Sequence, residues 1–319
     1  MRFLFAVAAL VAASASLAQE YPSSPVRFVV NFPPGGGVDL MGRVVGNALS
    51  RRIGQPVVVE NRPGAGGAVA AAAVAKANPD GYTVLVASNA AITQIPHLTP
   101  QPYDGLKDLV PVVKGVNLPT TVLVAGNAPY KSLRELLDFA RANPGKVTWG
   151  TPGNGSSMHL EVELLKEALG LDVTHIPYKG AAPIMADTMG GQVTVGAPGV
   201  PSTIGNIRSG KLRLLALWGT TRLPIFPDVP TVAEATGRAE LGGFPTWYGF
   251  LVPAGTRPEV VSRLEGHLVA SLRDPDVVKR MEESGAAIVA EGSAAFAAAN
   301  RTESATYASL FKKLGVKAE

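Results

Sequence analysis

Short β-branched or apolar runs alternate with helical stretches along most of the chain, and this alternation restricts the fold more than any other feature. The runs are residues 26–32, 56–61, 82–88, 121–126, 147–151, 173–178, 193–197, 212–218 and 248–253. Such alternation is typical of βαβ units, in which helices cover a sheet of parallel strands. The sequence therefore predicts an α/β fold with mostly parallel sheets.

Capping signals delimit the expected helices. Ser132 and Glu135 form a capping box at the start of a helix, and the Asn-Pro-Gly triplet at 143–145 ends that helix. Further helices are expected at 40–52, 157–169, 258–273, 276–284 and 294–314, with a short strand at 287–289. So few strand residues follow position 248 that the C-terminal segment should pack back onto the first part of the chain.

Length and composition suggest two lobes. A chain of 319 residues with 46% hydrophobic content can bury about two cores. Two segments, 118–126 and 244–253, are placed where the chain could cross between lobes. We expect lobe 1 to comprise residues 19–118 plus 249–319 and lobe 2 residues 119–248. Two crossings make a hinge between lobes that can close.

The N-terminal residues predict export. Arg2 precedes an apolar run at 3–11, and Ser16-Leu17-Ala18 is a small-residue cleavage site, so residues 1–18 are expected to be a signal peptide. The run is shorter than the ~20 residues of a membrane-spanning helix. The absence of cysteine excludes disulfides, lipid attachment through cysteine and thiolate metal sites. The formal charge of +4 is scattered, which argues against nucleic-acid binding.

A glycine-rich turn follows the first strand. Gly35, Gly36 and Gly37 precede Asp39 and a helix, so backbone N–H groups and a helix N-terminus could together hold an anion. We call residues 35–39 the first glycine turn. Plain packing is the alternative for such a turn, and Asp39 could simply cap its helix. Phe32, just before it, could wall a ligand site or belong to the core.

A second strand–turn–helix unit has the same design. Thr151, Gly153, Gly155 and Ser156 lead into a helix that carries His159. We call residues 151–159 the second glycine turn. Two such turns, one in each expected lobe, suggest that a ligand binds between them at the carboxyl ends of the strands. Trp247, beside the second crossing, is expected to line the same cleft.

Other motifs are incomplete. The first glycine turn lacks the Gly-Lys-Ser/Thr ending of a nucleotide P-loop, and the glycines at 64–67 only partly match a dinucleotide fingerprint. The four histidines show no metal spacing, so neither a metal nor a cofactor is expected. His159 near Ser156 or Ser157 leaves open a hydrolase-like enzyme, although the Gly-x-Ser-x-Gly elbow is absent.

Several ordered segments closely resemble the Bug family, the periplasmic substrate-binding proteins of tripartite tricarboxylate transporters. They are Tyr21-Pro22, the turn at 32–39, GQPVVVENRPGAGG at 54–67, PDGYT at 79–83, ANPGK at 142–146, HIPYKG at 175–180 and PDVPT at 227–231. The resemblance covers essentially the whole mature chain. It implies a type II periplasmic-binding fold, with two doubly wound lobes joined by two crossover strands.

The resemblance also implies a binding site and its partners. On the first lobe it adds Ser88 and Asn89 to the first glycine turn and Phe32. On the second it adds Tyr178 and Lys179 to the second glycine turn. A small carboxylate is the implied ligand, held largely by backbone amides and water. Transporter membrane subunits or a sensor protein are the implied protein partners, and the receptor is expected to be a periplasmic monomer.

The sequence departs from the family after residue 193. Where the family usually has acidic residues, this chain has Thr194 and then Ala197-Pro198. Thr194 and Pro198 are retained as candidate ligand contacts. Loss of an acid removes a counter-charge for an ammonium group, so a simple organic acid is expected rather than an amino acid. The leading interpretation is a solute receptor, not an enzyme; the alternatives are the hydrolase and a two-lobed adaptor for a protein partner.

Overall fold

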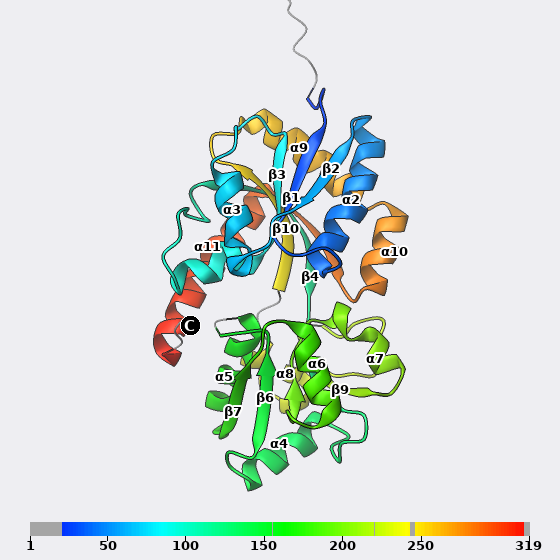
Figure 1. Ribbon diagram of the computed structural model, residues 1–319, viewed down its shortest axis with the longest axis vertical. Helices are drawn as coiled ribbons and strands as arrows, with labels where there is room; N and C mark the ends of the chain where they lie inside the picture. Colours follow the sequence, from blue (N-terminus) through cyan, green and yellow to red (C-terminus); the bar gives the residue numbers. More distant parts are fainter. Residues whose placement is uncertain (1–20, 155, 220, 243–245, 316–319) are drawn as a thin grey trace, which may run out of the picture.

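The computed structural model describes residues 21–154, 156–219, 221–242 and 246–315. They form two α/β lobes, one above the other in Figure 1, each built on its own sheet. The expected signal peptide at 1–18 lies outside these residues. No helix in the described ranges is long and apolar enough to cross a bilayer.

The upper lobe is built on a six-stranded sheet in the order β11-β4-β10-β3-β1-β2. Its strands are β1 (Val26–Val30), β2 (Val57–Asn61), β3 (Thr83–Ser88), β4 (Leu109–Leu118), β10 (Thr246–Pro253) and β11 (Ala287–Gly292). β1 pairs in parallel with β2 and β3, whereas β10 and β11 run antiparallel to their neighbours. The expected return of the C-terminal segment to the first lobe is confirmed, because β10 and β11 both join this sheet.

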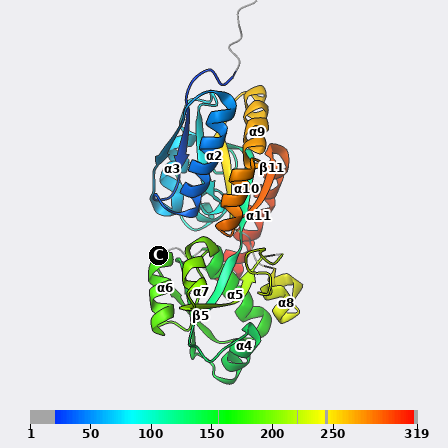
Figure 2. The ribbon, with the colours of Figure 1, turned by 90° about the vertical axis from the view of Figure 1, so that its right-hand side faces the viewer.

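Helices cover both faces of the upper sheet. On one face lie α2 (Gly37–Ile53), α9 (Pro258–Leu272) and α10 (Pro275–Glu283), and on the other α3 (Ala68–Ala75) and α11 (Ser293–Leu314) (Figures 1 and 2). The alternation within β1 explains this layering: Phe28 and Val30 enter the core under α2, while Val29 enters the core under α3. The sheet is therefore buried on both sides.

The lower lobe is built on a five-stranded sheet in the order β7-β6-β8-β5-β9. Its strands are β5 (Thr120–Ala125), β6 (Val147–Thr151), β7 (Val173–Pro177), β8 (Val195–Gly196) and β9 (Leu212–Trp218). Its helices are α4 (Leu133–Ala142), α5 (Ser157–Leu169), α6 (Ala181–Gly190), α7 (Ile204–Arg208) and α8 (Val232–Thr236). The Ser132 hydroxyl caps α4 as expected, but the Glu135 carboxylate accepts from the Lys131 N–H rather than returning to Ser132.

The expectation of mostly parallel sheets is wrong, because both sheets are mixed. In the lower sheet β6 pairs in parallel with β7 and β8, but β5 is antiparallel to β8 and β9. Apart from the β4–β11 pair, the antiparallel pairs among the described strands involve β5 or β10, the strands that follow each crossing. Parallel neighbouring strands require a crossover connection, usually a helix. A chain that passes directly from one sheet into the other has no such crossover, so its strand can pair antiparallel.

Strand β4 was not predicted, although it lies inside the upper sheet between β10 and β11. Its segment contains Pro111 and Gly115, both of which weaken a strand pattern. The structure accommodates Pro111 at a shift of register between Phe250 and Leu251 of β10, where a regular ladder hydrogen bond is not needed.

Helix α11 contacts both lobes. Tyr307 and Phe311 pack with Leu160 of α5, and Lys313 Nζ lies 2.6 Å from Glu167 Oε1. The chain itself passes between the sheets at Pro119, between β4 and β5, and joins the upper sheet again at Thr246. The lobe boundaries at 118/119 and 248/249 stay predictions; residues 246–248 pair with β4 of the upper sheet.

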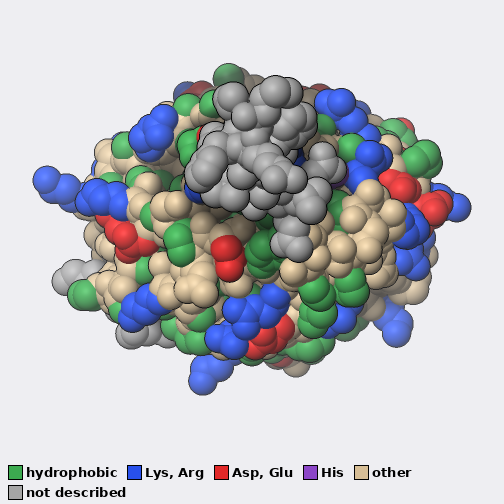
Figure 3. Space-filling view, turned by 90° about the horizontal axis from the view of Figure 1, so that it is seen from above, with side chains coloured by type: hydrophobic (Ala, Val, Ile, Leu, Met, Phe, Trp, Pro, Cys, Tyr) green, Lys and Arg blue, Asp and Glu red, His purple; other side chains and the backbone are tan. Residues whose placement is uncertain are grey.

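The face of the molecule seen from above in Figure 3 carries lysine, arginine and acidic side chains of both signs, interspersed with apolar and neutral surface. No continuous basic stripe crosses the part of this view that the grey atoms leave visible.

Candidate functional site

The first glycine turn is held together by Asp39. This residue lies in the first turn of α2 and is 4% exposed. Its carboxylate accepts hydrogen bonds from the Gly35 N–H at 2.9 Å, from Arg43 Nε at 3.0 Å and from Asn61 Nδ2 at 2.8 Å. Burial alone would raise the pKa of Asp39, but the bonds from Arg43, Gly35 and Asn61 outweigh it and lower the pKa. Asp39 therefore stays ionised, and its hydrogen bonds hold the first glycine turn in place.

Gly37 closes the turn against a strand of the same lobe. A Cβ atom at this position would lie 2.9 Å from Tyr248 Oη, so only glycine lets the start of α2 approach β10 this closely. Burial raises the pKa of Tyr248 to about 12, and the phenol stays protonated. Tyr248, a candidate beside Trp247 from the sequence, is thus a neighbour of the first glycine turn.

The strand β10 separates Trp247 from Tyr248. Trp247 is 1% exposed, packs edge-on against Phe296 and donates from Nε1 to Glu303 Oε2 at 2.7 Å. The structure places its ring in the core on the α3–α11 side, away from the turn that Tyr248 contacts. Because successive strand residues face opposite sides, only one of the two aromatics could lie beside the turn. The expectation that Trp247 lines the cleft chose the wrong member of the pair for this position.

The other predicted residues of the upper lobe are divided between the turn and the core. Phe32 is partly buried beside the α2 core, and its carbonyl accepts from Asn61 Nδ2. Ser88 ends β3 opposite Tyr248 and is 4% exposed, and its hydroxyl has no hydrogen-bond partner among the residues that the structure describes. Asn89 points elsewhere: its amide donates to buried Glu303 at 3.0 Å.

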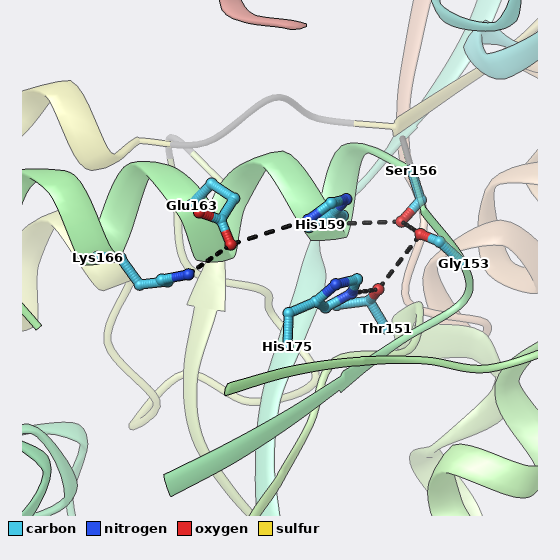
Figure 4. A network of polar contacts seen from close by, with 7 residues as sticks. All are labelled: Thr151, Gly153, Ser156, His159, Glu163, Lys166 and His175. Atoms are coloured by element: carbon cyan, nitrogen blue, oxygen red, sulfur yellow. Dashed lines mark hydrogen bonds and ion pairs between the residues drawn. The ribbon is translucent and has the colours of Figure 1, made fainter. Parts of the chain in front are cut away.

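The second glycine turn is held together by hydroxyl groups (Figure 4). The Ser156 hydroxyl accepts from the His159 N–H at 3.2 Å and donates to the Gly153 carbonyl at 2.8 Å. Thr151 Oγ1, completely buried at the end of β6, donates to the same carbonyl at 3.4 Å. Gly155 lies outside the described residues. Two hydroxyls thus hold the Gly153 carbonyl: that of Ser156, which caps α5, and that of Thr151, at the end of β6.

Two histidines stack beside this turn. The rings of His159 and His175 lie parallel, with centroids 3.8 Å apart and planes 8° from one another. His175 Nε2 shares a hydrogen bond of 2.6 Å with Thr151 Oγ1, and His159 Nε2 lies 3.8 Å from Glu163. Burial, then the charge of His159, lowers the pKa of His175 to about 4; burial likewise lowers the pKa of His159. Both rings are therefore neutral at pH 7.

Tyr178 follows β7 next to the second turn. Its N–H donates to the Thr151 carbonyl at 2.8 Å and its hydroxyl to Asp187 at 2.7 Å. A Cβ at Gly150 would lie 2.9 Å from the Tyr178 ring, so this glycine admits the aromatic side chain. Burial, with the bond to Asp187, raises the pKa of Tyr178 to about 12. Lys179, the next residue, is exposed.

Thr194 and Pro198 lie on either side of β8 and are not equivalent. Thr194 bonds to Thr148 near the start of β6, at the opposite end of that strand from Thr151. Pro198 is buried past the end of β8, and its carbonyl accepts from the N–H and the hydroxyl of Thr121. The structure therefore does not bring Thr194 together with the second glycine turn.

The two turns lie on the sides of their lobes that face each other. In Figure 1 the start of α2 is on the underside of the upper lobe and the start of α5 is at the top of the lower lobe. The lobes touch here, because Ser157 Oγ of α5 lies 3.1 Å from Thr246 Oγ1 at the start of β10. The two glycine turns, but not Asn89, Trp247 or Thr194, are thus presented toward the boundary between lobes.

Catalytic and metal arrangements receive no support from the geometry. Ser156 caps α5 and Ser157 bonds to Thr246, whereas the His159 ring lies 3.8 Å from Glu163 and stacks on His175. Within the described ranges, no cluster of three or more His, Asp or Glu side chains could hold a metal ion. A pocket of about 420 Å³ lies between α2 and α10 on the outer side of the upper lobe, and none of the predicted site residues lines it.

Comparison with known proteins decides the family. The sequence profile of the tripartite tricarboxylate transporter family receptor matches residues 41–316. This chain belongs to that family. Protein BugT of Bordetella pertussis is 38% identical over 288 residues, which are 89% of this chain and 86% of BugT. Members of the tripartite tricarboxylate transporter receptor family are periplasmic solute-binding proteins rather than enzymes.

Solved structures agree with the assignment. The periplasmic binding protein BugD superposes with a TM-score of 0.80 at 35% identity, over 94% of this chain and 100% of BugD. Rpa4515 of R. palustris, solved with adipate, gives a TM-score of 0.84 at 29% identity, over 94% of this chain and 100% of its own. The expected two-lobed periplasmic-binding fold of type II is confirmed.

Proposed function

We propose that this chain is a periplasmic receptor that captures a small organic carboxylate between its lobes, for uptake or sensing. The observation that carries the proposal is the pair of strand–turn–helix units, one on each facing side of the lobes, in a chain of this receptor family. Helix N-termini and turn amides suit a carboxylate without a cationic side chain. The adipate bound by Rpa4515 supports the same ligand class.

The ligand that we propose is a simple acid rather than an amino acid. The carboxylates beside predicted site residues are Asp39, Glu163, Asp187 and Glu303. Each already accepts a hydrogen bond or pairs with a cation of the protein. Pro198 stands at the end of β8, where an acid could have received an ammonium group. An ammonium group at this point would lose water without gaining a counter-charge, which costs free energy.

The predicted contacts fall into two groups for this function. We propose that Phe32, Gly36, Gly37 and Ser88 line the upper side, with Tyr248 added behind Gly37. On the lower side we propose Gly153, Gly155, Ser156, Tyr178 and Lys179. The two turns are supported, on the side away from the ligand, by Gly35, Asp39, Thr151 and His159. We further propose that the receptor is a monomer, is exported by its signal peptide, and delivers its ligand to transporter membrane subunits or a sensor protein.

Thermal shift and calorimetry with a fixed panel test this proposal. The panel contains acetate, adipate, citrate, glutamate and arginine, each added to the purified mature chain. Adipate or citrate should raise the melting temperature and bind in calorimetry, because a ligand that binds only the folded state stabilises it. Tight binding of glutamate or arginine with none of the other three would contradict the ligand class.

A turnover assay separates the receptor from an enzyme. Esters and amides incubated with the chain should remain intact. Hydrolysis that His159→Gln abolishes would favour the hydrolase interpretation instead. Native mass spectrometry of freshly purified protein adds an independent measurement, because a co-purified acid of defined mass identifies the ligand directly.

A further inference from the structure

His175 has no part in binding as described so far, and His159, which stacks on it, only supports the second glycine turn. His159 is 9% exposed and belongs to the first turn of α5, while His175 comes from β7, so two separate elements meet in the stack. Parallel imidazoles at 3.8 Å tolerate one positive charge poorly and two hardly at all, because each ring removes water from the other. The nearby helix N-terminus opposes a positive charge as well.

The charged groups around the stack are few. On α5 itself, Glu163 lies 3.8 Å from His159 and also holds Lys166 at 2.8 Å, so its charge is shared. The elements packed against α5 are β6, β7, η5 (Ala239–Leu241) and α11. Among their charged groups, Glu240 of η5 pairs with Arg238 and Lys313 of α11 with Glu167, and Glu303 of α11 accepts from Asn89, Thr93 and Trp247. Arg301 and Lys312 also belong to α11. β6 has no titratable side chain, and on α5 Glu161 bonds to Thr120.

A chain of hydrogen bonds links the stack to the second glycine turn. His175 bonds to Thr151, and Thr151 bonds to the Gly153 carbonyl, which Ser156 also holds (Figure 4). When His175 is protonated, its Nε2–H must donate to Thr151. The hydroxyl proton of Thr151 is then directed to Gly153. Protonation therefore secures the bond from Thr151 to Gly153, whereas a neutral ring that accepts at Nε2 takes the Thr151 hydroxyl proton away from the Gly153 carbonyl.

We propose that carboxylate binding beside Gly153 and Ser156 is coupled to protonation of the His159–His175 stack, with His175 as the positioning residue for Thr151. The inference rests on the proposed function, since it needs an anion beside Gly153. An anion at the start of α5 offsets the positive helix end and attracts the proton that the empty site rejects. Binding then takes up a proton, and by linkage the affinity increases as the pH falls.

Calorimetry with adipate tests the coupling. Binding is measured between pH 7 and pH 5 in pairs of buffers with different ionisation enthalpies, which gives the number of protons taken up. His175→Gln and His159→Gln remove the titrating rings, and Gln at 175 retains an N–H that can reach Thr151. His267→Gln on α9 of the other lobe is the matched control. Protonation of adipate itself contributes equally to all four measurements. Differences in proton uptake between the four proteins therefore come from the protein.

The wild type and His267→Gln should take up protons below pH 6. Their affinity should gain about threefold per pH unit relative to the two stack variants. Equal proton uptake in all four proteins would overturn the inference but leave the proposed function intact. Should no carboxylate bind at any pH, the proposed function fails and the inference with it.

Proton NMR of the ring signals provides the second readout. In the wild type the His159 and His175 signals should titrate together, and adipate should raise their midpoint. Independent titration of both rings near 6.5, unchanged by adipate, would contradict the coupling even where a variant folds poorly.

Discussion

The two glycine turns share one design but are stabilised by different chemistry. The first is held by an ionised carboxylate that receives the Gly35 N–H, Arg43 and Asn61. The second is held by the neutral hydroxyls of Ser156 and Thr151, backed by neutral imidazoles. A permanent charge fixes the first turn over a wide pH range, whereas the second turn can respond to protons. The comparison separates a turn built for rigidity from one open to regulation.

Replacing the carboxylate should have the largest effect. Asp39→Asn leaves Arg43 and the Gly35 N–H poorly satisfied, so the free energy of unfolding should fall by about 2 kcal/mol. Denaturant titration measures this loss. Asp138→Asn on α4 is the control, since its carboxylate is exposed and pairs with Arg141, and it should cost below about 0.5 kcal/mol. Equal losses in the two variants would show that the first turn does not depend on its charge.

Removing the helix cap should have an intermediate effect. Ser156→Ala deletes the acceptor for the His159 N–H, and unfolding should become easier by about 1 kcal/mol. Ser132→Ala removes the same kind of cap from α4 and should cost a similar amount. Only Ser156→Ala should also weaken adipate binding, measured by calorimetry. A cap variant of α4 that lost affinity equally would point to a global effect of stability.

The pH dependence of folding should be smaller. Because the folded pKa of His175 lies below its unfolded value, the unfolded chain binds more protons between pH 6.5 and pH 4. The contribution of neutral His175 to the free energy of unfolding should therefore be fully present above pH 6.5 and be lost as the pH decreases. With solvent screening the loss by pH 5.5 should stay below about 1 kcal/mol. His175→Gln should flatten the profile recorded by denaturant titration; an unchanged slope would assign it to other groups.

The smallest effect is expected at Thr194. Its hydroxyl bonds to Thr148 away from both turns, so Thr194→Val should change stability by less than about 0.5 kcal/mol and leave adipate affinity unchanged. Calorimetry that showed a clear loss of affinity would restore Thr194 to the ligand site.

Much of the fold followed from local pattern. The strands at β1 and β6 and the helices after each turn carried periodicity, capping residues and glycines that act within a few positions of one another. Strand β4 was not predicted because Pro111 and Gly115 interrupt its strand pattern, and its neighbours in the sheet stabilise it instead. Local signals therefore found the turns, but not the strand that lies between β10 and β11 in the sheet.

The site was predictable to the same extent. The glycines and Asp39 were visible, and the spacing of Arg43 four residues later could have indicated the ion pair. Asn61 reaches Asp39 from the end of a neighbouring strand, and no short-range pattern announces such a contact. The choice between Trp247 and Tyr248 depended on which side of β10 faces α2, which only the assembled sheet determines.

The attachment of α11 to both lobes gives the chain an internal reporter of opening. Tyr307 and Phe311 rest on Leu160, far along the sequence from either glycine turn. Any rotation that separates the lobes must slide or detach this contact and expose its apolar surface to water. Hydrogen exchange at the backbone amides of 305–312 should therefore slow when ligand closes the lobes, and would register the movement without a label.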